Sequence, residues 1–240
     1  MPNPLCENWE ITLLKRGINR LKGKPPQQKL PITVEFLRKI RVLLDMKMPF
    51  DVAFWAALLV GFYGFLRKST LLPSGKLVEG KFLARGDIVD FSLESFTLLV
   101  RHSKVIQFGQ KCLSIPFSRV LETQLCPVLA MLIHRGLSPM AAGKPLFNFL
   151  QSGVEITLSH TKFVSRLKSL LSLIGVDSQK YSAHSLRRGG ASFAFRAGLS
   201  PLEIKQRGDW ASSAFERYIH MDVKDSLISS RRLASGVVQE

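Results

Sequence analysis

The run His184-Ser185-Leu186-Arg187-Arg188-Gly189-Gly190 is followed by Gly208-Asp209-Trp210 and then by Tyr218-Ile219-His220. Upstream, Arg67 closes a long apolar stretch, and Lys104 lies in a segment with the pattern of a β-hairpin. Two arginines, a lysine, a histidine, an indole and a phenol form an unusual set of side chains. They are the groups that a tyrosine needs in order to break a phosphodiester without a metal ion.

The chemistry of these residue types supports that interpretation. A pentavalent phosphorus transition state carries negative charge on its non-bridging oxygens, to which arginine donates bidentately while staying charged. His184 and Arg187 are three residues apart, so both project to one side if the stretch is helical. Nearby guanidinium groups favour ionisation of the Tyr218 phenol, and His184 is able to accept its proton. Lys104 can protonate the leaving oxygen, and the indole N–H of Trp210 can hold a phosphate oxygen.

Charge is the outlier in the composition. The 240 residues include 34 Lys and Arg against 18 Asp and Glu, which gives a net charge of +16 and a pI near 10.2. A chain this basic usually binds a polyanion, most often nucleic acid, so double-stranded DNA is the expected partner. The candidate DNA-binding residues are Lys15, Arg16, Arg20, Lys22, Lys24, Lys162, Arg166, Lys168 and Arg188.

Several other classes are not expected. Cys6, Cys112 and Cys126 are an odd number without close spacing, which argues against disulfides and zinc. The N-terminus lacks the character of a signal peptide, and the uncharged stretch 52–66 is shorter than the roughly 20 residues that span a bilayer. We therefore expect no disulfide, zinc site, signal peptide or membrane segment. The remaining histidines, His134 among them, lack metal-ligand spacing and are expected to be surface or partly buried residues.

The hydrophobic pattern predicts a mostly α-helical chain with one small antiparallel β-sheet. Thr33 is expected to cap one helix, and Asp51 to cap the apolar helix that ends near Arg67. The expected strands lie at 87–89, 96–100 and 111–117, and further helices at 126–135, 159–174, 184–197, 201–207 and 213–220.

In this order, the motifs resemble those of the tyrosine recombinase (phage integrase) superfamily. The matching pieces are Gly64-Phe65-Leu66-Arg67, Ser103-Lys104, His184 to Gly190, Gly208-Asp209-Trp210 and Tyr218-Ile219. The spacing from Trp210 to Tyr218 looks most like that of recombinases from eukaryotic mobile elements of the DIRS and crypton kinds. The resemblance implies the DNA breaking-rejoining catalytic-domain fold. It also implies site-specific DNA recombination or integration through a 3′-phosphotyrosyl intermediate, without a metal or a high-energy cofactor.

The resemblance also assigns roles by motif position. It implies a phosphate clamp of Arg67 and Arg187, Lys104 as general acid, His184 as acid/base residue, Trp210 as phosphate-binding side chain and Tyr218 as nucleophile. One departure is Thr70, which stands where many members carry an acidic residue that braces the site.

The same resemblance divides the chain. Residues 1–24 are expected to be the remnant helix of an N-terminal core-binding domain, 25–31 a linker, 32–222 the catalytic domain and 223–240 a C-terminal tail. The tail is expected to mediate a homo-oligomer on DNA. A nuclear location is expected from the DNA role.

Alternatives to each assignment stay open at this point. Arg67 is also explained as a charge at a helix C-terminus. Arg188 is a rival of Arg187 for the clamp role, because it would also lie on the helix face of His184. Trp210 and Tyr218 are also explained as core aromatics, and Gly189-Gly190 as a pair that allows close helix packing. For the whole chain, the alternatives to an active strand transferase are a domesticated relative that binds DNA without cutting it and a type IB topoisomerase-like activity.

Overall fold

The computed structural model describes residues 9–22, 28–75, 77–103, 106, 111–221 and 223–236. The α-helices are α1 (Trp9–Lys22), α2 (Val34–Val42), α3 (Pro49–Tyr63), α4 (Lys68–Leu71), α5 (Pro127–Leu137), α6 (His160–Leu173), α7 (His184–Arg196), α8 (Pro201–Arg207) and α9 (Val223–Gly236). The strands are β1 (Ile88–Val89), β2 (Ser95–Val100), β3 (Leu113–Ser118), β4 (Phe149–Gln151) and β5 (Val154–Ile156). Short 3-10 helices are η2 (Arg85–Asp87), η3 (Thr123–Leu125), η4 (Ser178–Lys180) and η5 (Ser213–Tyr218). These elements confirm the mostly helical fold with a small antiparallel sheet.

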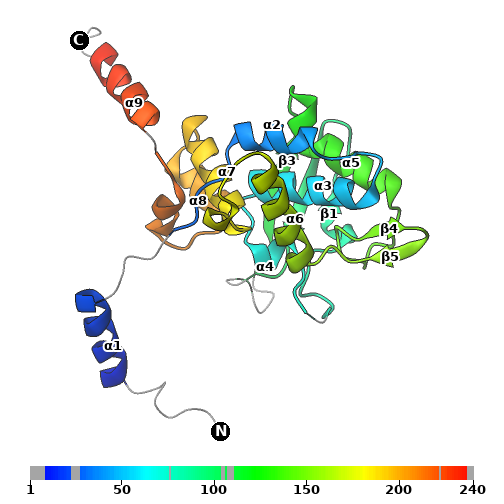
Figure 1. Ribbon diagram of the computed structural model, residues 1–240, viewed down its shortest axis with the longest axis horizontal. Coiled ribbons are helices and arrows are strands. Elements are labelled where there is room, and N and C mark those ends of the chain that lie inside the picture. The colour runs from blue at the N-terminus through cyan, green and yellow to red at the C-terminus, as the bar shows by residue number, and fades with distance from the viewer. Residues whose placement is uncertain are drawn as a thin grey trace.

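Helix α3 lies at the centre of the fold because it is apolar all round. Its residues from Asp51 to Phe62 are all buried, and a helix of this kind must be covered on every side. Helices α5 and α7 and strand β4 pack against it, as Figure 1 shows. The arrangement fixes the N-terminus of α7, where the motif beginning at His184 starts.

Helix α7 lies very close to its neighbours because of two glycines. A Cβ atom on Gly189 would lie 1.9 Å from the carbonyl oxygen of Ile32, and one on Gly190 would lie 2.0 Å from that of Phe62. A side chain at position 189 would therefore push α7 away from the segment before α2, and one at position 190 would push it away from α3. This confirms that the pair serves close packing.

Strands β1, β2 and β3 form an antiparallel sheet in that order. The register of β2 and β3 runs from Ser95 opposite Ser118 to Val100 opposite Leu113, which confirms the hairpin expected around Lys104. A second sheet, β4 with β5, was missed by the sequence analysis. Each of its strands has only three residues, too few for an alternating pattern, and Ser152 and Gly153 turn between them with positive φ.

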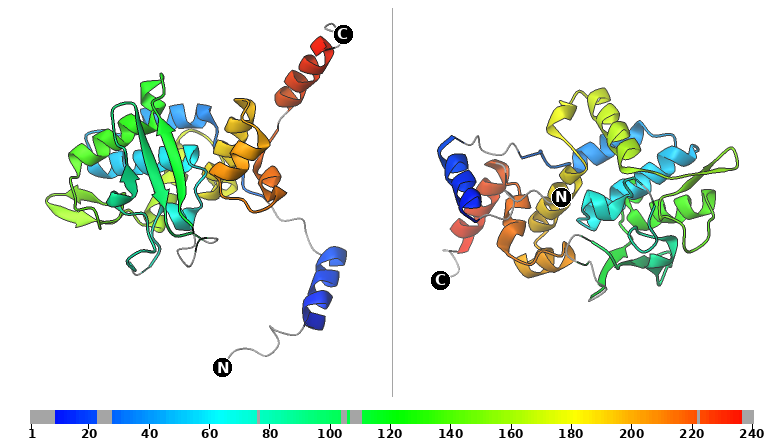
Figure 2. Two further views of the ribbon diagram at one scale, coloured as in Figure 1. Left: turned by 180° about the vertical axis from the view of Figure 1, so that it is seen from behind. Right: turned by 90° about the horizontal axis from the view of Figure 1, so that it is seen from below.

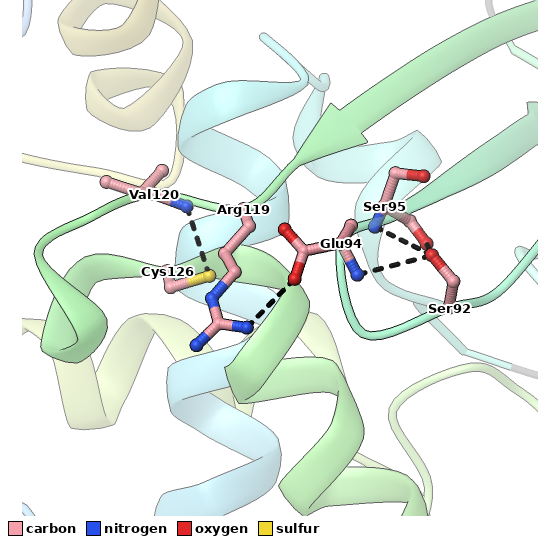
Figure 3. Close-up of polar contacts among 6 residues, drawn as sticks. All are labelled: Ser92, Glu94, Ser95, Arg119, Val120 and Cys126. Carbon is pink, nitrogen blue, oxygen red and sulfur yellow. Dashed lines mark hydrogen bonds and ion pairs between the residues drawn. The ribbon is translucent and has the colours of Figure 1, made fainter.

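A local polar network holds the end of the first sheet at which Ser95 pairs with Ser118 (Figure 3). The Ser92 hydroxyl accepts hydrogen bonds from the backbone N–H groups of Glu94 and Ser95, at 3.2 and 3.0 Å. Arg119, just after β3, forms an ion pair with Glu94 at 3.0 Å. These contacts fasten the turn before β2 to the end of β3. At the other end of the ladder, Val100 and Leu113 line a small cavity together with Arg67 and Arg187.

Helices α1 and α9 lie outside the body formed by the other elements (Figures 1 and 2). Both carry exposed apolar side chains, among them Trp9 and Leu21 on α1 and Leu227 and Ile228 on α9. They fall where the sequence predicts a remnant helix and a tail, but the domain boundaries themselves stay predictions.

The structure confirms one expected helix cap and corrects two other expectations. Thr33 caps α2 as expected, accepting from the Phe36 N–H at 3.2 Å. Asp51 does not cap α3, because the helix begins two residues earlier, at Pro49. His134 is fully buried, rather than a surface or partly buried residue, because α5 turns it toward the Leu146 carbonyl, 3.1 Å away.

Two further expectations concern the membrane and the thiols. In the part of the chain that the structure describes, no helix is both long and apolar enough to cross a membrane. Cys112 and Cys126 are both free thiols, the first exposed and the second buried.

Candidate active site

Arg187 is the most deeply buried charged residue of the predicted set, at 2% exposure. Its guanidinium donates through Nη1 to the Phe65 carbonyl and through Nη2 to the Gly208 carbonyl, the latter at 2.7 Å. Both carbonyls belong to turns with left-handed backbone, since φ is +49° at Phe65 and +51° at Asp209. Non-glycine residues adopt this conformation at an energetic cost, and such residues cluster at functional sites. The loop after α3 and the turn after α8 thus meet at one guanidinium.

Two aromatic side chains lie against this arginine. Its Cζ atom is 3.7 Å from the centroid of the Trp210 ring and 5.3 Å from that of Tyr218. The Tyr218 ring also lies 5.0 Å from the His184 ring and 5.1 Å from the Trp210 ring, between centroids. Four of the six predicted catalytic side chains are therefore in one cluster.

Trp210 fits both roles that the sequence left open, that of a core aromatic and that of a phosphate-binding side chain. It is buried, at 6% exposure, in an apolar cluster with Phe65, Ile204 and Phe215. Its indole Nε1 is also buried and has no hydrogen-bond partner among the described residues. Buried donors are normally satisfied, so this N–H is available to an acceptor that enters the site.

Tyr218 is the last residue of η5 and is held in place by α7. The hydroxyl of Ser192 donates to the Tyr218 carbonyl at 3.3 Å and accepts from the His220 N–H at 2.8 Å. Ser192 is itself buried. It ties the backbone on both sides of the tyrosine to the helix that carries His184 and Arg187. Sequence analysis missed Ser192, because a serine inside a helix carries no signal of such a role.

The electrostatics of the cluster are unusual. Burial, followed by the positive charge of Arg67, lowers the pKa of Arg187. Burial also lowers the pKa of His184, with further contributions from Arg187, Arg188 and nearby cations. The His184 imidazole is therefore neutral at pH 7 and able to accept a proton. Among the described residues, no carboxylate forms an ion pair with Arg187, so the site favours an anionic ligand.

Arg67 lies beside this guanidinium rather than at the end of the apolar helix. Helix α3 ends at Tyr63, and Arg67 precedes α4 as its N-cap. The explanation of Arg67 as a helix C-terminal charge is therefore wrong. A small cavity is lined by Arg67, Thr70 and Arg187 together.

A larger cleft opens at Tyr218. Its volume is about 390 Å³, and its lining residues are Gln28, Lys29, His184, Arg188, Arg217 and Tyr218. Arg188 donates to the Gln28 side chain at 2.6 Å, so it faces this cleft and not the carbonyls that Arg187 binds. Lys29 and Arg217 add positive charge here. Sequence analysis did not name Arg217, although it is adjacent to the tyrosine.

The remaining predicted residues are placed in several ways. Arg166 binds the Asp51 carboxylate through two nitrogens, at 2.9 to 3.1 Å. Lys162 and Arg16 are exposed and Lys168 is half-buried. Lys104 and Lys24, and the side chains of Lys15, Arg20 and Lys22, lie outside what the structure describes.

The described residues contain no group of three or more His, Cys, Asp or Glu that could hold a metal ion. Arginine side chains supply most of the positive charge around the cluster, with Lys68 and the Asp209 carboxylate also nearby. The chemistry that this arrangement supports is stabilisation of an anion next to a phenol and a neutral imidazole.

The chain is similar to part of one known recombinase in sequence. No model of a known protein family matches the chain. An integrase/recombinase xerD homolog of Selenomonas ruminantium is 27% identical over 214 residues, which cover 85% of this chain and 57% of the relative. The chain thus spans little more than half the length of that protein.

Two solved structures have a similar fold. The XerH site-specific recombinase, bound to palindromic difH substrate in a post-cleavage complex, matches with a TM-score of 0.59 and 17% identity, over 89% of this chain and 54% of that chain. XerA recombinase matches with a TM-score of 0.60 and 17% identity, over 89% of this chain and 67% of that chain. The fold is therefore that of the tyrosine recombinase catalytic domain, as the sequence predicted. In sequence and in fold the chain is similar to integrases and recombinases.

Proposed function

We propose that this chain cleaves and rejoins DNA strands in site-specific recombination or integration, with Tyr218 as the nucleophile. The observation that carries the proposal is the packing of one phenol against a buried guanidinium, an imidazole and an indole. The Tyr218 ring lies within 5.3 Å of Arg187 and 5.0 Å of His184. The similarity to the xerD homolog supports the same class of reaction.

In the proposed reaction, the Tyr218 hydroxyl oxygen attacks the scissile phosphorus. A bond forms between that oxygen and phosphorus, and the bond from phosphorus to the 5′-oxygen of the next nucleotide breaks. His184 accepts the phenol proton, and Lys104 gives a proton to the leaving oxygen. The energy of the broken bond is kept in the 3′-phosphotyrosine, so rejoining is the same step in reverse.

Arg67 and Arg187 would hold the two non-bridging oxygens while charge builds on them. Arg187 is already fixed by two backbone carbonyls, so little reorganisation is needed when the phosphate enters. Trp210 would supply a third donor, because its indole N–H has no partner among the described residues. In this arrangement the protein side chains do the work that metal ions do in other phosphoryl-transfer enzymes.

The proposed partner is double-stranded DNA, bound mainly through its phosphates. The net charge of +16 and the cations around the cleft support this. The predicted DNA-binding lysines and arginines of residues 15–24 would extend the contact. A homo-oligomer on DNA through the exposed apolar side chains of α9 belongs to the same proposal. So do an origin in a eukaryotic mobile element and a nuclear location.

A nicked suicide duplex tests the proposal. Cleavage near the nick releases a short oligonucleotide, so the phosphotyrosyl product accumulates and appears as a slower band on a denaturing protein gel. The proposal predicts this adduct with the chelator EDTA present and its loss in Tyr218→Phe. Tyr63→Phe is a matched control, since Tyr63 lies at the end of α3, away from the open cleft.

The same assay separates the two alternatives. Salt-sensitive DNA binding without an adduct on any tested duplex would support a relative that binds without cutting. Relaxation of a supercoiled plasmid that lacks a recombination site would support a type IB topoisomerase-like activity.

A further inference from the structure

The small cavity at the arginine cluster contains a single carboxylate among its described lining residues. Arg67, Arg187 and Arg207 contribute three positive charges to this lining, and Asp209 contributes the acid. Thr70, from α4, lines the same cavity without charge. The cations of the site therefore share one counter-charge, and it comes from the turn between α8 and η5.

Asp209 is held in an unusual way. Its backbone is left-handed, with φ of +51°, and its side chain is only 11% exposed. The carboxylate oxygen Oδ2 is buried and has no hydrogen-bond partner among the described residues. Burying a carboxylate oxygen without a partner is costly unless cations surround it. A strained backbone and a buried charge at one residue point to a role beyond closing the turn.

The other oxygen of Asp209 reaches across the structure to the hairpin. Its Oδ1 accepts an ion-paired hydrogen bond from Lys111 Nζ, 98 residues away in sequence. Lys111 lies two residues before Leu113, which pairs with Val100 at the end of the β2–β3 ladder. The ion pair therefore fastens the returning arm of this hairpin to the turn that carries Gly208 and Trp210.

We propose that Asp209 and Lys111 are positioning residues for strand cleavage. The ion pair anchors the β2–β3 hairpin beside the arginine cluster, and Lys104 belongs to the chain segment that connects these two strands. This inference rests on the proposed function, because it concerns the geometry of that reaction. The negative charge of Asp209 also counteracts the lowering of the Arg187 pKa by burial and by Arg67.

The ion pair contributes to the geometry of the site rather than to DNA binding. Lys111 is 55% exposed, so solvent screens its charge, and Arg67, Arg187 and Arg207 still line the cavity with the Asp209 carboxylate when Lys111 is replaced. A displacement of about 1 Å in a catalytic group, however, can lower a rate by about 100-fold. Loss of the pair should thus reduce cleavage far more than folding. If Lys111 instead contacted a DNA phosphate, its loss would reduce DNA affinity, and loss of Asp209 would not slow cleavage.

Single-turnover cleavage of the nicked suicide duplex, at saturating DNA, tests the inference. Asp209→Asn and Lys111→Met should each lower the rate constant by about 10- to 100-fold with little change in DNA affinity. Lys111→Arg keeps the ion pair and should retain most of the rate. The double variant Asp209→Asn/Lys111→Met should be no slower than the slower single variant, because both changes break the same contact.

Asp90→Asn is the matched control, because Asp90 is also a left-handed aspartate, with φ of +52°, but is exposed in the turn after β1. Asparagine is tolerated in this conformation, so neither change should disturb the turn itself. Equal rates for Asp209→Asn and Asp90→Asn would overturn the inference. So would additive effects in the double variant, or a Lys111→Met defect confined to DNA affinity.

Hydrogen exchange separates a failure of this inference from a failure of the proposed function. The peptide covering residues 111–118 should exchange faster in Asp209→Asn than in the wild type or in Asp90→Asn, with or without DNA. If the wild type forms no adduct at all, the proposed function fails while this exchange result still reports on the anchor. Unchanged exchange in Asp209→Asn would show that the ion pair does not anchor the hairpin.

Discussion

Arg166 and Arg187 lie on α6 and α7, and both were predicted to serve a DNA phosphate. Arg166 binds the carboxylate of Asp51 through two nitrogens, and both side chains of this pair are largely buried. Arg187 is more deeply buried but binds two backbone carbonyls, and its nearest aromatic neighbours are Trp210 and Tyr218. The first guanidinium has a full counter-charge within the fold. The second does not, and an anionic ligand would supply it.

This difference separates an arginine that holds the fold together from one that can do chemistry. A bidentate carboxylate leaves Arg166 little capacity to bind phosphate, whatever its position on a basic helix. Two carbonyl acceptors orient Arg187 without neutralising it, so its charge remains available. The comparison leads to four predictions, in which substitution of Arg166 affects stability but neither cleavage nor DNA binding, and substitution of Arg187 affects cleavage.

The largest effect is expected for Arg187. Arg187→Ala should lower the single-turnover cleavage rate by about 10²- to 10³-fold or more, because it removes a preorganised donor to the transition state. Arg187→Lys keeps the charge but loses the planar fork, and should also be strongly impaired. DNA retention in a gel-shift assay should change little for both variants. A comparable loss of retention and cleavage would mean that Arg187 positions DNA rather than acting on the reaction.

Arg166→Ala should affect folding instead. It leaves the Asp51 carboxylate buried without its partner, which is expected to cost about 3 kcal/mol of unfolding free energy in urea denaturation. The cleavage rate per folded molecule should stay close to that of the wild type. The double variant Asp51→Asn/Arg166→Met should recover part of the loss, since no unpaired charge then remains. A stable Arg166→Ala protein with weak DNA binding would contradict the comparison.

The pH dependence of cleavage should reflect the cations around His184. Its pKa is lowered by burial and then by the positive charges of Arg187 and Arg188. The neutral, proton-accepting form therefore persists below pH 6.5, and the rate at limiting DNA should fall only as the pH drops further. Arg188→Gln removes one of these charges, so it should move the midpoint upward toward 6.5. Arg166→Gln should leave it unchanged, and a wild-type midpoint above 6.5 would contradict this account.

The smallest expected effect concerns the salt dependence of DNA binding. Lys162 is exposed on the same helix as Arg166 and, among the described residues, forms no ion pair with a carboxylate. Lys162→Gln should reduce the slope of log affinity against log salt by about 1, as for the loss of one phosphate contact. Arg166→Gln should leave that slope unchanged. Equal changes for both variants would place Arg166 among the DNA contacts after all.

The sequence predicted the fold class and the cluster of His184, Arg187, Trp210 and Tyr218. These residues were found because a rare set of chemical groups occurs in a fixed order along a short segment. The pairing of Arg166 with Asp51 could not be predicted, because the two residues are 115 positions apart and each had a plausible local explanation. Asp51 lay near the expected start of a helix, and Arg166 lay on a basic helix face.

The contacts that orient the site were missed for a related reason. Ser192, Asp209 and Lys111 each hold a backbone segment or a hairpin arm through one polar contact. Such contacts depend on how α7, η5 and the sheet pack together. No spacing or periodicity along the chain encodes them, even for Asp209, which lies within the Gly208-Asp209-Trp210 motif.

The identity of the residue that becomes bound to DNA tests the central claim most directly. After reaction with a suicide duplex in EDTA, digestion with trypsin should yield the peptide from Tyr218 to Lys224. The account predicts that mass spectrometry finds the nucleotide remnant on the Tyr218 side chain of this peptide. A remnant on any other residue, or an adduct that persists in Tyr218→Phe, would contradict it.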